Sequence, residues 1–291
     1  MLISSALITG LGLGSMYGLL ALGYQATYAV SNTVNFSQGS VMMLGAVLCF
    51  TFWITFGWPP LLAALVALIL CGLWSALVER MAVRPFVLRG SNSWLMATVA
   101  LGIVVENVVL FTFGKEPRGM PASMLTGISV SIAGLRIQLL QFLIPLVGLA
   151  VAAGLHLFFQ RTRYGKALLA VVQNRDAARL MGIDVERAVT ASYILSGLLA
   201  GIAGIMVAPL FTISSTMGTL FGIKAFAVAI LGGIGSAWGV VLAGLIYGLA
   251  EALITSLLGS IYTQILTFGL VILALAFRPS GLFGRSDVKK V

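Results

Sequence analysis

The chain has 291 residues, of which 60% are hydrophobic and 9% charged, whereas a soluble domain carries roughly 25% charged residues. So few charges cannot cover a soluble protein of this size, and the composition therefore predicts a chain whose solvent is membrane lipid. The excess of 17 Lys and Arg over 8 Asp and Glu is confined to short connectors. This distribution is typical of membrane-protein loops and argues against nucleic-acid binding.

Eight apolar stretches follow in chain order, each near the roughly 20 residues that a helix needs to cross a bilayer. They cover residues 4–29, 36–56, 59–78, 93–113, 137–159, 189–212, 223–255 and 257–277, and the seventh is interrupted. Backbone polar groups in lipid must be satisfied within their own segment, so these stretches are predicted to be helices. The sequence thus predicts an all-α polytopic membrane bundle that forms one domain over residues 1–291.

Three basic connectors indicate the cytoplasmic loops, because Lys and Arg in short loops stay on that side. Their charges are Arg80, Arg84 and Arg89; Arg161, Arg163, Lys166, Arg175, Arg179 and Arg187; and Arg278, Arg285, Lys289 and Lys290. One apolar stretch separates segment 114–136 from each neighbouring basic connector. This segment is therefore predicted to lie outside the cytoplasm. Three apolar stretches separate the last two basic connectors. Three crossings cannot return the chain to the same side, so one of these stretches must fail to cross. This parity predicts six crossings, re-entrant second and seventh stretches and cytoplasmic termini, and it leaves eight crossings open.

Two windows interrupt the second and seventh stretches: Ser31–Ser40 is polar, and Leu231–Gly239 contains four glycines. Irregular backbone at membrane depth survives only against protein or a watery cavity, and paired interruptions are typical of a translocation path. The alternative is that the glycines only permit close helix packing. The residues expected to line the path are Asn35, Ser37, Gln38, Gly39, Gly232, Gly233, Gly235 and Ser236.

Other glycines are spaced by four residues and predict close contacts between helices. They are Gly10, Gly14 and Gly18; Gly197 and Gly201; and Gly244 and Gly248. Each set leaves one helix face without side chains, which is the pattern of small-residue packing in membranes.

Two acidic residues, Glu106 and Glu251, lie within apolar stretches. A carboxylate at membrane depth is costly, so each is expected to have a functional role or a pairing partner. The sequence leaves both interpretations open, including a helix-end position for Glu251 and, for Glu106, an arginine partner or a hydrogen bond to a neighbouring helix.

Sequence motifs for catalysis or for a cofactor are missing from the chain. No GxxxxGK[ST] pattern occurs, so we expect no ATP hydrolysis by this chain. The one histidine, His156, has no metal-binding motif around it, and Cys49 and Cys71 lie inside apolar stretches. We therefore expect neither enzymatic activity, nor a bound metal or other cofactor.

A segment over about residues 161–187 is predicted to be cytoplasmic and amphipathic. Its apolar residues 168, 171, 172, 177, 180 and 181 follow helical spacing, with Arg175 and Arg179 on the other face. Gly182 is a typical C-terminal cap. Such a helix can lie on the membrane surface or enter a groove of a partner protein.

The chain resembles the LivH-type permease subunits of bacterial branched-chain amino acid ABC importers over essentially its whole length. The motifs that carry the resemblance are Gly12–Tyr24, Val34–Gly39, Gly165–Gly182, Lys224–Phe226 with Gly232–Ser236 and Ala250–Ala252, and Arg278–Gly284. Where the family often has Asn-Phe-Ala-His-Gly, this chain has Asn35-Phe36-Ser37-Gln38-Gly39. The change leaves the architecture intact and leaves the substrate open.

The resemblance implies an ATP-driven importer of the bacterial inner membrane that works by alternating access. Its partners would be a second homologous permease, two cytoplasmic ATPase subunits that use the ATP, and a periplasmic solute-binding protein. Segment Gly165–Gly182 would be the coupling loop on the ATPases, with Ala178 packed between Gly165 and Gly182. Three alternatives stay open: a permease of this family for urea or short amides, a stand-alone ion-coupled transporter that uses Glu106 or Glu251, and a purely structural membrane protein.

Overall fold

The computed structural model describes residues 2–121, 129–132 and 135–284. Its helices are α1 (Leu2–Ser31), α2 (Gln38–Phe50), α3 (Pro60–Val78), α4 (Arg84–Leu88), α5 (Trp94–Phe113), α7 (Leu139–Arg161), α8 (Arg163–Gln173), α9 (Arg175–Leu180), α10 (Val185–Val207), α11 (Met217–Gly232), α12 (Ala237–Leu258) and α13 (Ser260–Phe277). The π-helical turns η1 (Thr51–Thr55) and η2 (Glu79–Val83) extend α2 and α3. Strands β1 (Ser129–Ile132) and β2 (Leu135–Gln138) form an antiparallel hairpin.

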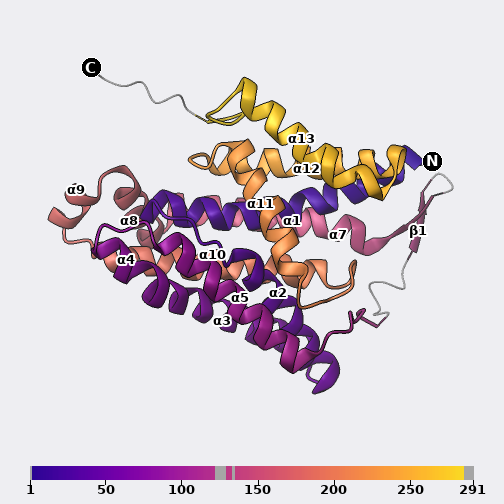
Figure 1. The fold of residues 1–291 in the computed structure, drawn as a ribbon, viewed down its shortest axis with the longest axis horizontal. Helices are drawn as coiled ribbons and strands as arrows, with labels where there is room; N and C mark the ends of the chain where they lie inside the picture. The colour runs from indigo at the N-terminus through magenta and orange to yellow at the C-terminus, as the bar shows by residue number, and fades with distance from the viewer. Residues whose placement is uncertain (1, 122–128, 133–134, 285–291) are drawn as a thin grey trace.

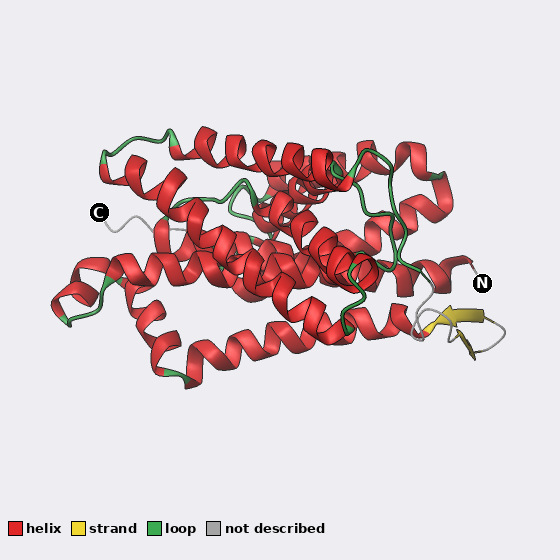
Figure 2. Cartoon of the chain, turned by 90° about the horizontal axis from the view of Figure 1, so that it is seen from below, coloured by secondary structure: helices red, strands yellow, loops and turns green. Residues whose placement is uncertain are grey.

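Among these residues, eight helical segments are long and apolar enough to cross a membrane, and α11 is shorter, with 16 residues. The predicted all-α polytopic bundle is thereby confirmed (Figure 2). The hairpin was not predicted as strands. It belongs to the connection between α5 and α7 and lies at the end of the bundle where α1 begins (Figure 2).

The first two basic connectors gather at one end of the bundle, which we call the basic end. Arg84 forms an ion pair with Glu186, with Nη1 3.3 Å from Oε2. Arg175 donates a hydrogen bond to the carbonyl of Val30 in the last turn of α1. The hairpin and the beginning of α1 lie at the opposite end (Figure 1). Of the third connector, Arg285, Lys289 and Lys290 lie outside the described residues.

Helices α1 and α12 pack antiparallel through their glycines, as the spacing predicts. A methyl group at Gly14 would lie 2.7 Å from the Cα atom of Leu245, and one at Gly10 would lie 2.9 Å from that of Leu249. Helix α13 turns back from α12 at Gly259, where φ is +88°, and so runs parallel to α1. Helix α1 therefore begins at the end of the bundle opposite to that where α13 ends. The predicted placement of both termini on one side is wrong.

The bundle contains two similar halves that run in opposite directions. In one, α1 is followed by the irregular residues 32–37, then α2 and α3; in the other, α10 is followed by the irregular residues 208–216, then α11 and α12. Helices α1 and α10 are antiparallel, because Thr33 after the end of α1 lies 2.9 Å from the hydroxyl of Tyr193 near the start of α10. Helix α1 packs on α11 and α12, and α10 packs on α2 and α3. Inverted repeats with interrupted helices are typical of transporters.

The glycine-rich window after α11 is not a break in the middle of a helix. Residues 233–236 form a turn at the basic end that joins α11 to α12. Gly233 ends α11 with φ of +84°, and the Ser236 hydroxyl accepts a hydrogen bond from the Gly239 N–H to cap α12. The prediction of one interrupted stretch over 223–255 is therefore wrong. The interruption that matches 32–37 is 208–216, which precedes α11.

Candidate functional site

Helices α2 and α11 each follow one of the two interruptions, and we call them the half-helices. They cross where both begin. A methyl group at Gly39 would lie 2.7 Å from the Cα atom of Gly222 and even closer to the carbonyl of Gly218. Only glycine fits this crossing. The two helices also begin with similar sequences. The start of α2 is Ser37-Gln38-Gly39-Ser40, and the start of α11 is Thr216-Met217-Gly218-Thr219. The structure thus brings the beginnings of both halves together at one point, which we call the α2–α11 crossing.

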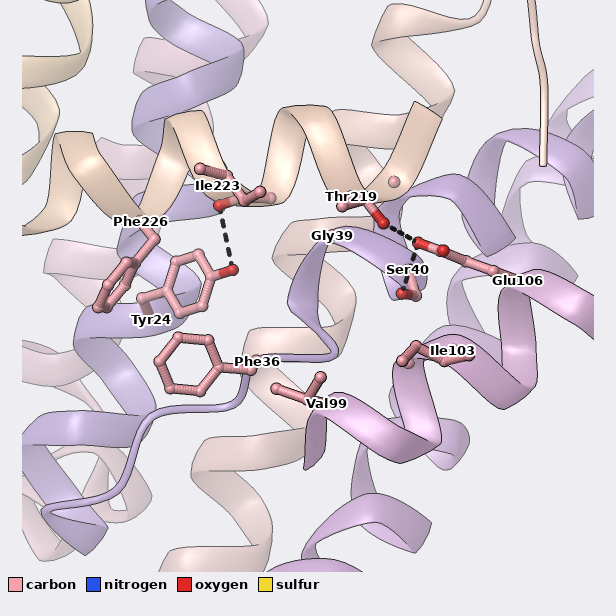
Figure 3. Close-up of a pocket in the computed structure, with 13 residues that line it drawn as sticks. Tyr24, Phe36, Gly39, Ser40, Val99, Ile103, Glu106, Thr219, Ile223 and Phe226 are labelled. Carbon is pink, nitrogen blue, oxygen red and sulfur yellow. Dashed lines mark hydrogen bonds between the residues drawn. The ribbon is translucent and has the colours of Figure 1, made fainter. Parts of the chain in front are cut away.

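Glu106 on α5 joins the two half-helices at this crossing. Its Oε1 atom accepts hydrogen bonds from the Ser40 hydroxyl of α2 at 3.2 Å and from the Thr219 hydroxyl of α11 at 2.6 Å (Figure 3). Ser40 and Thr219 each occupy the third position of their helix. Helix N-termini carry a partial positive charge, so the first turns of both helices are favourable surroundings for an acidic side chain. Of the two roles open for Glu106, hydrogen bonding to neighbouring helices is what the structure shows.

A cavity of about 300 Å³ opens beside Glu106. Its walls come from α1, α2, α5, α11 and the first interruption, and they are mostly aromatic or aliphatic. The rings of Phe36 and Phe226 lie 5.1 Å apart, and those of Tyr24 and Phe226 lie 5.6 Å apart. Figure 3 shows this aromatic cluster at one side of the cavity and Glu106 at the other. A single carboxylate in an otherwise apolar cavity suits a small ligand that has a cationic group and an aliphatic part.

Most of the predicted path residues of the first interruption form hydrogen bonds on the side of α2 away from the cavity. Gln38 is fully buried and exchanges two hydrogen bonds with Ser196 of α10, at 3.0 and 2.7 Å. Asn35 accepts hydrogen bonds from both the N–H and the hydroxyl of Ser37. None of Asn35, Ser37 and Gln38 lines the cavity beside Glu106, whereas Gly39 does.

The four predicted path residues of the second window lie elsewhere. Gly233, Gly235 and Ser236 line a separate cavity at the basic end, together with residues that follow α13. Gly232 packs against α12, where a methyl group would lie 2.6 Å from the Cα atom of Val240. The structure therefore does not bring Gly232, Gly233, Gly235 and Ser236 together with the α2–α11 crossing.

Glu251 has a partner that sequence analysis did not assign. Its Oε1 atom lies 2.5 Å from the Nζ atom of Lys224 on α11, and the Lys224 ammonium also reaches the Tyr17 hydroxyl at 3.4 Å. Both charged residues are buried. A lone lysine in an apolar stretch was the signal, because a buried charge needs a counter-charge. The helix-end position considered for Glu251 is wrong, since residues up to Leu258 continue α12.

The segment predicted as one amphipathic helix forms two, because the chain turns at Asn174. The Asn174 side chain accepts hydrogen bonds from the N–H groups of Asp176 and Ala177 and caps α9. The turn separates the two halves of the predicted apolar face. Leu168 and Val171 of α8 are buried in a small cluster, whereas Leu180 and Met181, at the end of α9, are 89% and 83% exposed.

The individual coupling residues are placed as follows. Gly182 follows the end of α9 with φ of +82°, and the N–H of Ile183 donates to the Ala178 carbonyl. Gly182 is thus the C-terminal cap that the sequence predicts. Ala178 is buried among residues of α1, α8 and α10. Gly165 packs on the end of α7, where a methyl group would lie 2.6 Å from the Cα atom of Phe159. Of the two arginines, Arg175 is tied to α1, and Arg179 is exposed.

Comparisons with known proteins agree with this architecture. Residues 6–275 match the family described as "Branched-chain amino acid transport system / permease component". The chain is 35% identical to the high-affinity branched-chain amino acid transport system permease protein BraD of Pseudomonas aeruginosa, over 98% of this chain and 97% of that one. It is 31% identical to the corresponding permease protein LivH of Escherichia coli, over 98% and 96%.

A solved structure shows a similar fold. It is PsaBC from Streptococcus pneumoniae in complex with Fab, with a TM-score of 0.51, 16% identity and coverage of 94% of this chain and 91% of that chain. Eight helices among the described residues are long and apolar enough to cross a membrane, which together with the permease relatives indicates a multi-pass membrane protein. By the family match and the full-length identities, the chain belongs to the permease components of branched-chain amino acid transport systems.

Proposed function

We propose that this chain forms part of the translocation path of an ATP-driven importer for branched-chain or other small aliphatic amino acids. Relatives named as branched-chain amino acid permeases support the substrate class. The observation that carries the proposal is the α2–α11 crossing, where Glu106 links two opposed half-helices beside an apolar cavity. The carboxylate suits the ammonium group of an amino acid, and the apolar walls suit its side chain.

The crossing also suggests how access alternates. Helices α2 and α11 belong to opposite halves of the inverted repeat, and the Glu106 hydrogen bonds and the glycine contacts join them at this point. A relative shift of the two half-helices breaks the bonds from Ser40 and Thr219 and opens the cavity towards one side of the membrane. Solute passes without covalent chemistry, and this chain needs no cofactor of its own.

Partner subunits supply the energy and the solute in this proposal. Two cytoplasmic ATPase subunits bind at the basic end, where α8 and α9 present the exposed side chains of Tyr164, Leu180 and Met181. A second homologous permease completes the path, and a periplasmic solute-binding protein delivers the amino acid at the opposite end. The protein then resides in the bacterial inner membrane, with the basic end in the cytoplasm.

Removing the charge of Glu106 tests the proposed path. We expect Glu106→Gln to lower ATP-driven leucine uptake by about 10- to 100-fold in proteoliposomes containing the assembled importer, since a hydrogen bond to a charged group contributes about 1.5–3 kcal/mol. The matched control is Asn107→Ala, because the neighbouring Asn107 donates to Ile103 in its own helix. Uptake by Glu106→Gln at the rate of the Asn107→Ala importer would contradict the proposal.

The coupling role of α9 has its own test. Gly182 has open space around it and a left-handed backbone, so Gly182→Arg places a bulky charge at the proposed ATPase surface. Gly182→Asn keeps a residue that tolerates this backbone conformation. We expect Gly182→Arg to abolish stimulation of uptake by ATP while Gly182→Asn retains most of it. Unchanged ATP-driven uptake by Gly182→Arg in an intact complex would show that α9 does not couple.

A further inference from the structure

A second polar cavity lies on the other side of α11 from the Glu106 site. It has a volume of about 520 Å³ and contains the buried pair Lys224 and Glu251. Helix α11 separates the two cavities, since Thr219 and Ile223 face the first while Phe221 and Lys224 face the second. The cavity is lined by the beginnings of α1 and α13 and the end of α12. It therefore opens near the end of the bundle opposite the basic end, where solute arrives in the proposed orientation.

The ion pair in this cavity is incompletely satisfied. Glu251 uses Oε1 for Lys224, at 2.5 Å, whereas its Oε2 atom is buried and has no hydrogen-bond partner among the described residues. Glu251 is only 8% exposed and Lys224 only 6%. A buried ion pair is favourable only when its remaining lone pairs are also hydrogen-bonded. Glu251 lines the cavity, and a purely structural link between α11 and α12 has no need of a buried carboxylate oxygen that has no hydrogen-bond partner.

The surroundings of the pair define which ligand fits. One wall carries hydroxyl groups of α12 and α13, including Thr255 and Thr263, whose hydroxyl oxygens lie 2.9 Å apart. Other parts of the wall are apolar and include Leu13, Phe211 and Phe221. A positive and a negative group side by side, next to an apolar wall, complement a zwitterion with an apolar side chain.

We propose that Lys224 and Glu251 form an outer binding site for the zwitterionic head of an aliphatic α-amino acid, before the solute reaches the Glu106 cavity. The ammonium group of the ligand binds the carboxylate of Glu251, and its own carboxylate binds the ammonium of Lys224. The aliphatic side chain lies against the apolar wall. This inference deepens the proposed function and rests on it for the substrate class.

Protection of a cysteine from alkylation tests this site in the assembled importer in nanodiscs. Gln264→Cys places a thiol on the cavity wall, and Ile265→Cys places the control thiol on the next residue, which is 72% exposed and does not line the cavity. The natural Cys49 and Cys71 are buried. The probes are L-leucine, leucinol, which lacks the carboxylate, and 4-methylpentanoate, which lacks the ammonium group.

We expect leucine at about four times its dissociation constant to slow alkylation of Gln264→Cys by about fivefold, since the free fraction of a site is 1/(1 + [L]/Kd). Alkylation of Ile265→Cys should not change, and leucinol and 4-methylpentanoate at the same concentration should not protect. Leucine should lose its effect when Glu251→Gln is added. The two analogues test the site with Lys224 and Glu251 intact, so the conclusion does not depend on whether that variant folds.

Three results would overturn the outer site: equal protection at both cysteines, protection by either analogue as strong as that by leucine, or no protection by leucine. Leucine uptake by the same complex with natural residues at 264 and 265 is measured in parallel. An importer that shows protection but no leucine uptake contradicts the proposed function and not this site. An importer that takes up leucine without protection contradicts this site and not the proposed function.

Discussion

The windows Ser31–Ser40 and Leu231–Gly239 look alike in sequence, since both interrupt an apolar stretch with small and polar residues. In the structure, the first leads from the end of α1 back into the bundle, so that α2 starts against the middle of α10. The second is a turn at the basic end that joins two antiparallel helices. An interruption therefore marks a path only when the next helix starts inside the bundle, and this depends on the packing of other helices.

The largest expected effect separates these two windows by one substitution made in each. Gly39→Val places a side chain against the backbone of Gly218 and Gly222, so the α2–α11 crossing must open. Gly235→Val meets nothing within 4 Å. We expect Gly39→Val to lose uptake by more than about 100-fold, as for severe overpacking of a core, and Gly235→Val to stay within about twofold, as for a change at an open position. Equal uptake by the two variants, measured in proteoliposomes, would break the comparison.

A smaller effect is expected at Gln38, which holds the start of α2 against α10. Gln38→Leu removes both hydrogen bonds to Ser196 and takes away the acceptor of the buried Ser196 hydroxyl. This should lower the free energy of unfolding by roughly 2 kcal/mol and lower the thermal midpoint of the purified complex. Gln38→His, which restores the residue that the family often has at this position, is the control. A midpoint unchanged in Gln38→Leu would show that the amide does not hold α2 to α10.

The smallest effect is expected at the turn of the second window. Ser236→Ala removes the side-chain cap of α12, which should cost about 1 kcal/mol of stability. Uptake should remain near that of the unchanged importer, because Ser236 lines a cavity separate from the Glu106 site. Ser236→Thr keeps the capping oxygen and serves as the control. A large loss of uptake in Ser236→Ala with normal stability would show that this turn belongs to the translocation path.

The sequence predicted those features that depend on local composition. Apolar length indicated the membrane helices, the polar run Asn32–Gln38 indicated the first interruption, and Gly182 indicated the end of α9. The second interruption also had a local signal, Pro209 followed by Thr212, Ser214, Ser215 and Thr216. The four glycines of the window Leu231–Gly239 are a stronger helix-breaking signal, and they drew the prediction to the wrong segment.

The parts of the site that could not be predicted depend on contacts between distant elements. Glu106 was a candidate on grounds of its charge, but its partners Ser40 and Thr219 lie on two other helices. Lys224 and Glu251 are 27 residues apart in the chain and meet only because α11 and α12 pack antiparallel. Local spacing carries no information on either set of contacts.

The central claim is that the two half-helices separate at the α2–α11 crossing when solute passes. The most direct measurement is uptake by an importer with Ser40→Cys and Thr219→Cys, joined by a short bifunctional thiol reagent that can be cleaved by reductant. Each single-cysteine variant treated in the same way is the control. We expect the joined importer to bind its partners but to lose ATP-driven uptake, which returns on cleavage. Uptake by the joined importer at the rate of the single-cysteine controls would show that the half-helices need not separate.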